Sequence, residues 1–212
     1  MKRNAKVFAI VLAMVMLVTV SVVLTYAYLT SQTATVNNAF TVGNVKITLD
    51  EAEVTPDGVK VDPENRVIAN DYHLIPGRSY SKDPTVHVDA TSEDCWVFVQ
   101  VKVEDSVDLE LLLNGQDAVA AGVITGLDLT KWTVVSNELD GAVRTYVFVH
   151  NAIASANDDL VLFTGLSVPA TITGDQLATI AGLKIDVIAC AVQAAGFDTY
   201  QAVIDANVVS FN

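Results

Sequence analysis

Three histidines, His73, His87 and His150, are the residues whose type best suits metal or acid–base chemistry. They are followed by Leu-Ile-Pro-Gly, Val-Asp-Ala-Thr and Asn-Ala-Ile-Ala. None of them therefore begins the H-E-x-x-H helix that zinc proteases use to place two ligands on one face. The sequence predicts no catalytic, metal-binding or cofactor-binding residues. A metal site stays open only if folding brings the three separated histidines together.

Other enzyme signatures are also missing from the sequence. It contains no Gly-x-Ser-x-Gly elbow and no glycine-rich phosphate loop. A glycosidase-type carboxylate pair stays open, because acidic residues are common enough for two to lie close by chance. Trp96, Trp132 and Tyr146 could form a platform for stacking on sugars, but aromatic residues on strands more often belong to the core. We therefore expect a structural or binding protein rather than an enzyme.

The two cysteines, Cys95 and Cys190, are too few to build a disulfide scaffold. One bridge between them would close a long loop and stabilise the fold. The alternative, which we favour, is two small apolar side chains buried on separate strands. Neither cysteine has a histidine partner nearby in sequence, so a thiol nucleophile is not expected.

The charge balance excludes several classes of partner. The 212 residues carry a net charge of −13, from 12 basic and 25 acidic residues. Lys2, Arg3 and Lys6 all lie in the first 27 residues, which hold no acid, so the remainder has nine basic and 25 acidic residues and a net charge of −16. Nucleic acids and anionic membranes need basic surfaces, so both are excluded as partners. No Asp-x-Asp-x-Asp-Gly calcium loop occurs.

Residues 1–27 have the pattern of a signal peptide. A basic start precedes an apolar run from Val7 to Val18, and the segment ends in Thr25-Tyr26-Ala27. Small residues at the first and third of these last positions predict cleavage between Ala27 and Tyr28. The run is long for a signal peptide, so an uncleaved membrane anchor is the alternative. We expect a secreted protein that contacts the membrane only through the uncleaved leader.

Alternating apolar and polar residues predict about eight strands in the rest of the chain. The clearest covers 95–103, with Val97, Val99, Val101 and Val103 on one face. Segments 132–135 and 145–149 predict a strand pair around Asp140-Gly141. The other predicted strands cover 45–49, 59–61, 85–89, 160–168 and 183–192, and short helices are expected within 105–126 and over 175–181. This pattern predicts an all-β fold, an antiparallel β-sandwich or jelly roll with one or two short helices, in one domain over 44–212.

Several stretches resemble a known family of exported proteins. They are the leader ending in Thr-Tyr-Ala before Tyr-Leu-Thr, the run Asn38-Ala39-Phe40-Thr41-Val42-Gly43-Asn44-Val45-Lys46-Ile47-Thr48-Leu49, the triplet Ile75-Pro76-Gly77, and Lys82-Asp83-Pro84-Thr85-Val86. The chain resembles the TasA/camelysin family of Gram-positive biofilm-matrix proteins, which the SipW-type signal peptidase processes. The resemblance covers the leader and the first third; from Val103 onward only the strand pattern and length are similar.

The resemblance implies a jelly-roll subunit that assembles into extracellular fibres by donating its freed N-terminal segment to the sheet of the next subunit. The donor segment would lie within 28–43 and comprise Tyr28, Leu29, Thr30, Ser31, Gln32, Thr33, Ala34, Thr35 and Val36, none of which is charged. Its partners would be other copies of the chain, head to tail, and the SipW-type signal peptidase. Binding to other matrix proteins or to a polysaccharide stays open. The alternatives are a secreted camelysin-like metalloprotease and a monomeric carbohydrate-binding module.

Overall fold

The computed structural model describes residues 12, 14–17, 44–61 and 65–211. The chain divides into two units, residues 1–41 and 42–212. In the first unit, Leu12 and residues 14–17 are helical and exposed. None of the helices in these described ranges has the length and apolar character needed to span a membrane. The predicted cleavage site and the donor segment lie outside the described residues.

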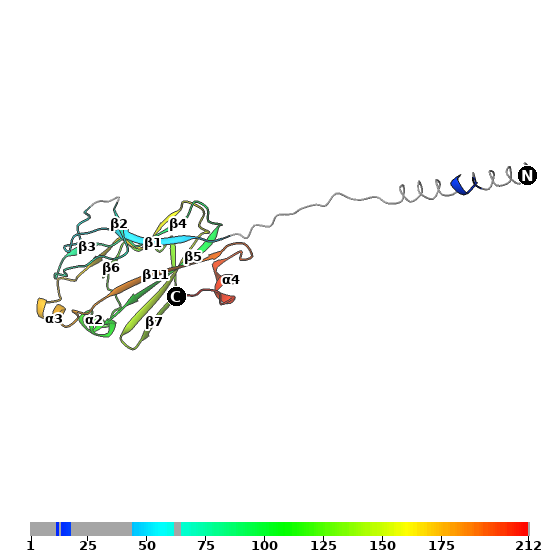
Figure 1. The fold of residues 1–212 in the computed structure, drawn as a ribbon. Coiled ribbons are helices and arrows are strands. Elements are labelled where there is room, and N and C mark those ends of the chain that lie inside the picture. Colours follow the sequence, from blue (N-terminus) through cyan, green and yellow to red (C-terminus); the bar gives the residue numbers. More distant parts are fainter. Residues whose placement is uncertain (1–11, 13, 18–43, 62–64, 212) are drawn as a thin grey trace, which may run out of the picture. The chain divides into compact units, whose positions relative to one another are not determined.

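The second unit consists mostly of antiparallel strands (Figure 1). They form three sheets with the orders β2-β1-β4-β9, β3-β10-β6 and β11-β5-β8-β7. The strands are β1 (Ile47–Ala52), β2 (Arg66–Val67), β3 (Ser79–Ser81), β4 (Thr85–Val88), β5 (Cys95–Val103), β6 (Ile124–Thr125), β7 (Trp132–Asp140), β8 (Val143–His150), β9 (Asp159–Val161), β10 (Gly165–Ser167) and β11 (Ile185–Gln193). The prediction of a mostly β protein with antiparallel sheets is confirmed.

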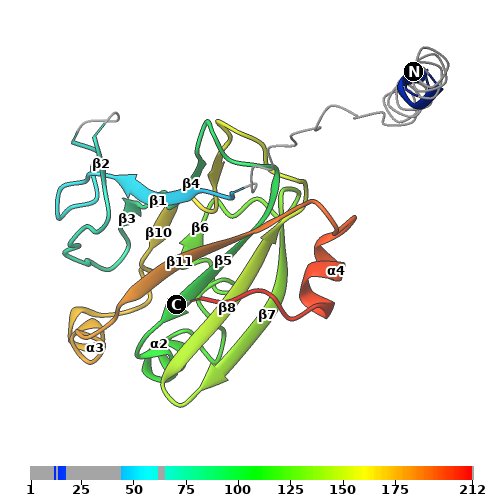
Figure 2. The same ribbon diagram turned by 45° about the vertical axis from the view of Figure 1, so that its right-hand side comes forward.

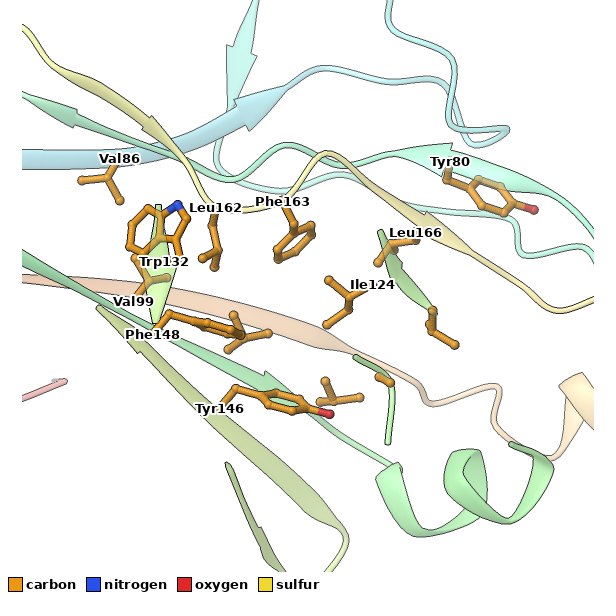
Figure 3. Close-up of a cluster of buried hydrophobic side chains, with 14 of the residues drawn as sticks. Tyr80, Val86, Val99, Ile124, Trp132, Tyr146, Phe148, Leu162, Phe163 and Leu166 are labelled. Atoms are coloured by element: carbon orange, nitrogen blue, oxygen red, sulfur yellow. The ribbon is translucent and has the colours of Figure 1, made fainter. Parts of the chain in front are cut away.

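One hydrophobic core lies between these sheets. Val97, Val99, Val101 and Val103 of β5 are fully buried in it, as their alternation predicts. Figure 3 shows side chains from the β5-β8-β7 side meeting others from the opposite side, around Phe163. Each large side chain buried there contributes about 1.5–3 kcal/mol of hydrophobic stabilisation.

A second, smaller cluster covers the other face of β5. Trp96 and Phe98 pack there with Val203 of helix α4 (Tyr200–Asp205), which begins at the N-cap Thr199. The Trp96 indole N–H donates to the carbonyl oxygen of Phe197, 3.0 Å away. The C-terminal segment therefore shields one end of this sheet face. The sequence prediction did not include α4.

The remaining helices agree with prediction in place but not in length. Helix α2 (Ser106–Leu112) lies within 105–126, and α3 (Gly174–Ala178) overlaps 175–181. A capping box of Thr173 and Gln176 starts α3, with each side chain accepting from the backbone N–H of the other.

The predicted strand over 160–168 is wrong in one respect, because it is two strands in different sheets. Strand β9 pairs with β4, whereas β10 pairs with β3 and β6. Between them Leu162 and Phe163 are both buried in the core. A continuous strand would send these neighbours to opposite faces, so the chain bends to bury both.

Candidate functional site

Among the described strands, none pairs with one of the two backbone edges of β1 along its first half. The carbonyl oxygen of Lys46 accepts from the N–H of Asp89, so the backbone groups of Lys46, Thr48 and Asp50 face β4. Those of Ile47 and Leu49 face the opposite side, because antiparallel ladders alternate. Strand β2 pairs on that side only further along, at Glu51 and Ala52.

Strand β11 has an open edge along its whole length. It ends its sheet and pairs only with β5 among the described strands. The N–H of Glu104 donates to the carbonyl oxygen of Lys184, so alternate residues from Lys184 onward face β5. The backbone groups of Ile185, Val187 and Ala189 therefore face outward. In Figure 1 and Figure 2, β11 lies on the side of β1 that is opposite to β4.

A pocket of about 630 Å³ separates the end of β1 from the start of β11. The turn after β2, the segment joining β3 to β4 and Leu166 of β10 complete its wall. The lining residues are Leu49, Asp50, Glu51, Ile68, Ala69, Asn70, Asp71, Tyr72, Leu74, Lys82, Pro84, Leu166, Leu183, Lys184, Ile185, Asp186 and Val187. Two strands with unpaired edges therefore border one cavity.

A buried ion pair lines this pocket. Lys82 Nζ lies 2.6 Å from Glu51 Oε2, and the two residues are only 9% and 5% exposed. Asn70 donates to the other carboxylate oxygen of Glu51 at 3.0 Å, and Lys82 Nζ lies 5.7 Å from the centre of the Tyr72 ring. Burial raises the pKa of Tyr72 well above its ordinary value, and the charges of Glu51 and Asp83 raise it further. The part of the pocket wall formed by Glu51 and Lys82 is thus both polar and largely buried.

Asp83 connects the end of β1 to the segment between β3 and β4, beside the pocket. Its Oδ1 accepts from the backbone N–H of Ala52 at 2.8 Å, and its Oδ2 lies 2.6 Å from Lys60 Nζ and 3.5 Å from Arg66 Nη1. Burial raises the pKa of Asp83, but the contacts with Lys60, Ala52 and Arg66 outweigh it and hold that pKa below its ordinary value. The neighbouring residues Lys82 and Asp83 thus both bind the end of β1, Lys82 at Glu51 and Asp83 at Ala52.

His87 links strands β1, β4 and β9 on the outer side of the sheet β2-β1-β4-β9. Its Nε2 lies 2.9 Å from Asp50 on β1, and its Nδ1 lies 2.5 Å from Asp159 on β9. Arg66 also donates to Asp50, at 2.7 Å. Burial lowers the pKa of His87, but its contacts with Asp159 and Asp50 outweigh this effect and raise the pKa above the ordinary 6.5.

We expect the stability of the protein to depend on pH through His87. The folded state holds the His87 proton more tightly than the unfolded chain, so this stabilisation is complete below about pH 6.5 and is lost as pH rises through the raised pKa. Urea unfolding of the wild type and of His87→Gln, at several values from pH 5 to pH 9, measures it. The difference in unfolding free energy between the two should shrink as pH rises. A difference that does not change with pH would contradict the prediction.

The three histidines occupy three different places in the described structure. His73 lies in the loop before β3, His87 is in β4, and His150 ends β8 with its Nδ1 2.9 Å from the carbonyl oxygen of Ala152. Within the described ranges, no three His, Cys, Asp or Glu side chains are arranged to hold a metal ion.

The aromatic residues considered as a sugar platform are buried instead. Trp132 and Tyr146 belong to the main core, and Trp96 belongs to the smaller cluster. Each polar atom has a partner: the indole of Trp132 donates to Val161, and the Tyr146 hydroxyl donates to Asp117. The platform interpretation is wrong, and the favoured core interpretation is confirmed.

Cys95 and Cys190 are both free thiols. In the register of β5 and β11, Cys95 opposes Gln193 whereas Cys190 opposes Phe98. Cys95 therefore shares the core face with Val97, and Cys190 points to the other face of the sheet. This geometry does not fit a bridge between them. Burial raises the pKa of Cys95 to about 11, with Asp94 and Asp158 adding to the effect.

Comparison of the chain with protein-family models, curated proteins and solved structures found no match. The family resemblance drawn from the sequence therefore stays a prediction. Glu51, Asn70 and Arg66 could not be identified as site residues from the sequence, because their partners are distant along the chain. In the sequence, Lys82 and Asp83 stand out only as part of a stretch that resembles the TasA/camelysin family.

Proposed function

We propose that this protein is a secreted structural subunit that polymerises into extracellular biofilm-matrix fibres by donating its N-terminal segment as a strand to the next subunit. In this proposal the body is a jelly roll with two open strand edges, one on the first half of β1 and one on β11. The observation that carries the proposal is the pair of open strand edges on either side of one pocket.

Open strand edges favour the addition of another strand. Unpaired N–H and C=O groups at a sheet edge form hydrogen bonds readily with an extended peptide. The backbone N–H and C=O groups on the open edge of β11 belong to residues such as Val187 and Ala189, whose side chains pack against the core. An added strand would satisfy the backbone groups and also cover these partly exposed side chains.

The charges of the chain suit the same assembly. The body is strongly acidic, and two such bodies repel one another unless a specific contact overcomes the repulsion. The segment Tyr28–Val36 has no charged side chain, so it can enter a neighbour without burying one. Because one subunit donates and another accepts, the contact is head-to-tail and does not close, which produces filaments.

Electron microscopy of residues 28–212 beside residues 37–212 tests the proposal. The eleven strands of the described residues all lie within 42–212, so the shorter protein keeps each of them. We expect filaments from the longer protein and monomers from the shorter one at the same concentration. Equal thermal unfolding temperatures would show that the shorter body is folded. Filaments from both, or from neither over a range of pH and salt, would contradict donor-strand assembly.

A further inference from the structure

The pocket between β1 and β11 is not a purely apolar groove. Its wall contains the buried Glu51–Lys82 ion pair, together with Asn70 and Tyr72. Lys82 Nζ carries three N–H donors, and Glu51 Oε2 is its one hydrogen-bond acceptor among the described residues. The remaining N–H groups need water or an incoming ligand.

A strand that enters this pocket displaces water from the ion pair. If its side chains were apolar, the remaining donors of Lys82 would be left without acceptors, which is costly once the strand has excluded water. Hydroxyl or amide oxygens on the strand could accept those hydrogen bonds instead. A charged side chain would also have to lose its hydration, which costs more.

The proposed donor segment has the composition that such a pocket requires. In an extended strand, Ser31, Thr33 and Thr35 share one face, while Thr30 and Gln32 lie on the other. Both faces therefore offer hydroxyl or amide oxygens at consecutive positions. A strand selected only for apolar burial would carry valine or isoleucine at these positions.

We propose that the buried Glu51–Lys82 ion pair is the specificity determinant of the pocket, and that it selects an uncharged strand rich in hydroxyl side chains. This inference rests on the proposed donor-strand function and adds the side chains that recognise the donor. Lys82 donates to an oxygen of the inserted strand, and Glu51 holds the ammonium in place. The pair thus discriminates against aliphatic strands as well as charged ones.

Donor variants that keep the body unchanged test this proposal. Threonine and valine have the same shape, so Ser31→Ala/Thr33→Val/Thr35→Val and Thr30→Val/Gln32→Met each remove the polar groups of one strand face. Sedimentation of residues 28–212 gives the critical concentration for assembly of each variant. We expect one of the two variants to raise it about tenfold, because a donor of Lys82 loses its acceptor. If the pocket were apolar, the valine variants would instead lower the critical concentration, because their donor strands would bind more tightly than the wild-type strand.

The matched body variant is Glu51→Leu/Lys82→Met, which replaces the ion pair with apolar side chains. Combined with the sensitive donor variant, it should remove the tenfold penalty. A penalty that persists in this body, or donor variants that assemble as well as the wild type or better, would overturn the inference but leave the proposed function standing. If the wild type itself does not assemble, the proposed function fails instead. If the body variant does not fold, the direction in which the donor variants change the critical concentration still tests the inference.

Discussion

Changing Ala189 to proline should raise the critical concentration for assembly by at least about tenfold while leaving the body folded. The backbone N–H of Ala189 faces the open edge of β11, away from β5. Proline removes that donor and places its ring in the path of an incoming strand, but it breaks no hydrogen bond to β5. Sedimentation and electron microscopy of residues 28–212 measure the effect.

The matched control is Val134→Pro at the other open edge of the same sheet. Strand β7 lies at the opposite end of the sheet from β11. The N–H of Asn151 donates to the carbonyl oxygen of Lys131, so Lys131 and Thr133 face β8, whereas Val134 lies between such positions. Its N–H therefore also faces outward. We expect this variant to assemble like the wild type, because β7 does not border the pocket. Equal impairment of both variants would show that the β11 edge has no special role in assembly.

Replacing Lys82 alone with methionine should lower the unfolding free energy by about 3–5 kcal/mol, because it leaves the Glu51 carboxylate buried without its charge partner. The double variant Glu51→Leu/Lys82→Met should recover most of this loss. It removes both charges, and Asn70 keeps its other acceptor, the carbonyl oxygen of Ala52, at 3.0 Å. Urea unfolding of the three proteins at one pH measures both effects.

The comparison between the single and double variants separates stability from recognition. A loss below about 1 kcal/mol in Lys82→Met would show that Glu51 is hydrated rather than desolvated. If the double variant is as unstable as the single one, the shape of the side chains matters more than their charge pairing. A stable double variant that still prefers a hydroxyl-rich donor would place recognition elsewhere in the pocket.

The sequence determined the elements whose signal is local. The alternation over Cys95–Val103 set both the limits of β5 and the face that each valine buries, because successive strand residues point to opposite sides. The strand pair around Asp140-Gly141 followed from a turn signal between two alternating segments. The apolar residues Val45, Ile47 and Leu49 all pack against the core, as their alternation predicts, although strand β1 itself begins at Ile47.

Only the tertiary structure decided which strands end the sheets and which side chains meet at the pocket. Glu51 and Lys82 are 31 residues apart and His87 and Asp159 are 72 apart, so no local pattern could pair them. The division of 160–168 into two strands likewise depends on where the core accepts Leu162 and Phe163. Periodicity in the sequence shows only which face of a strand each residue occupies. Strand order depends on contacts between distant segments, so the open edges of β1 and β11 could not be predicted from the sequence.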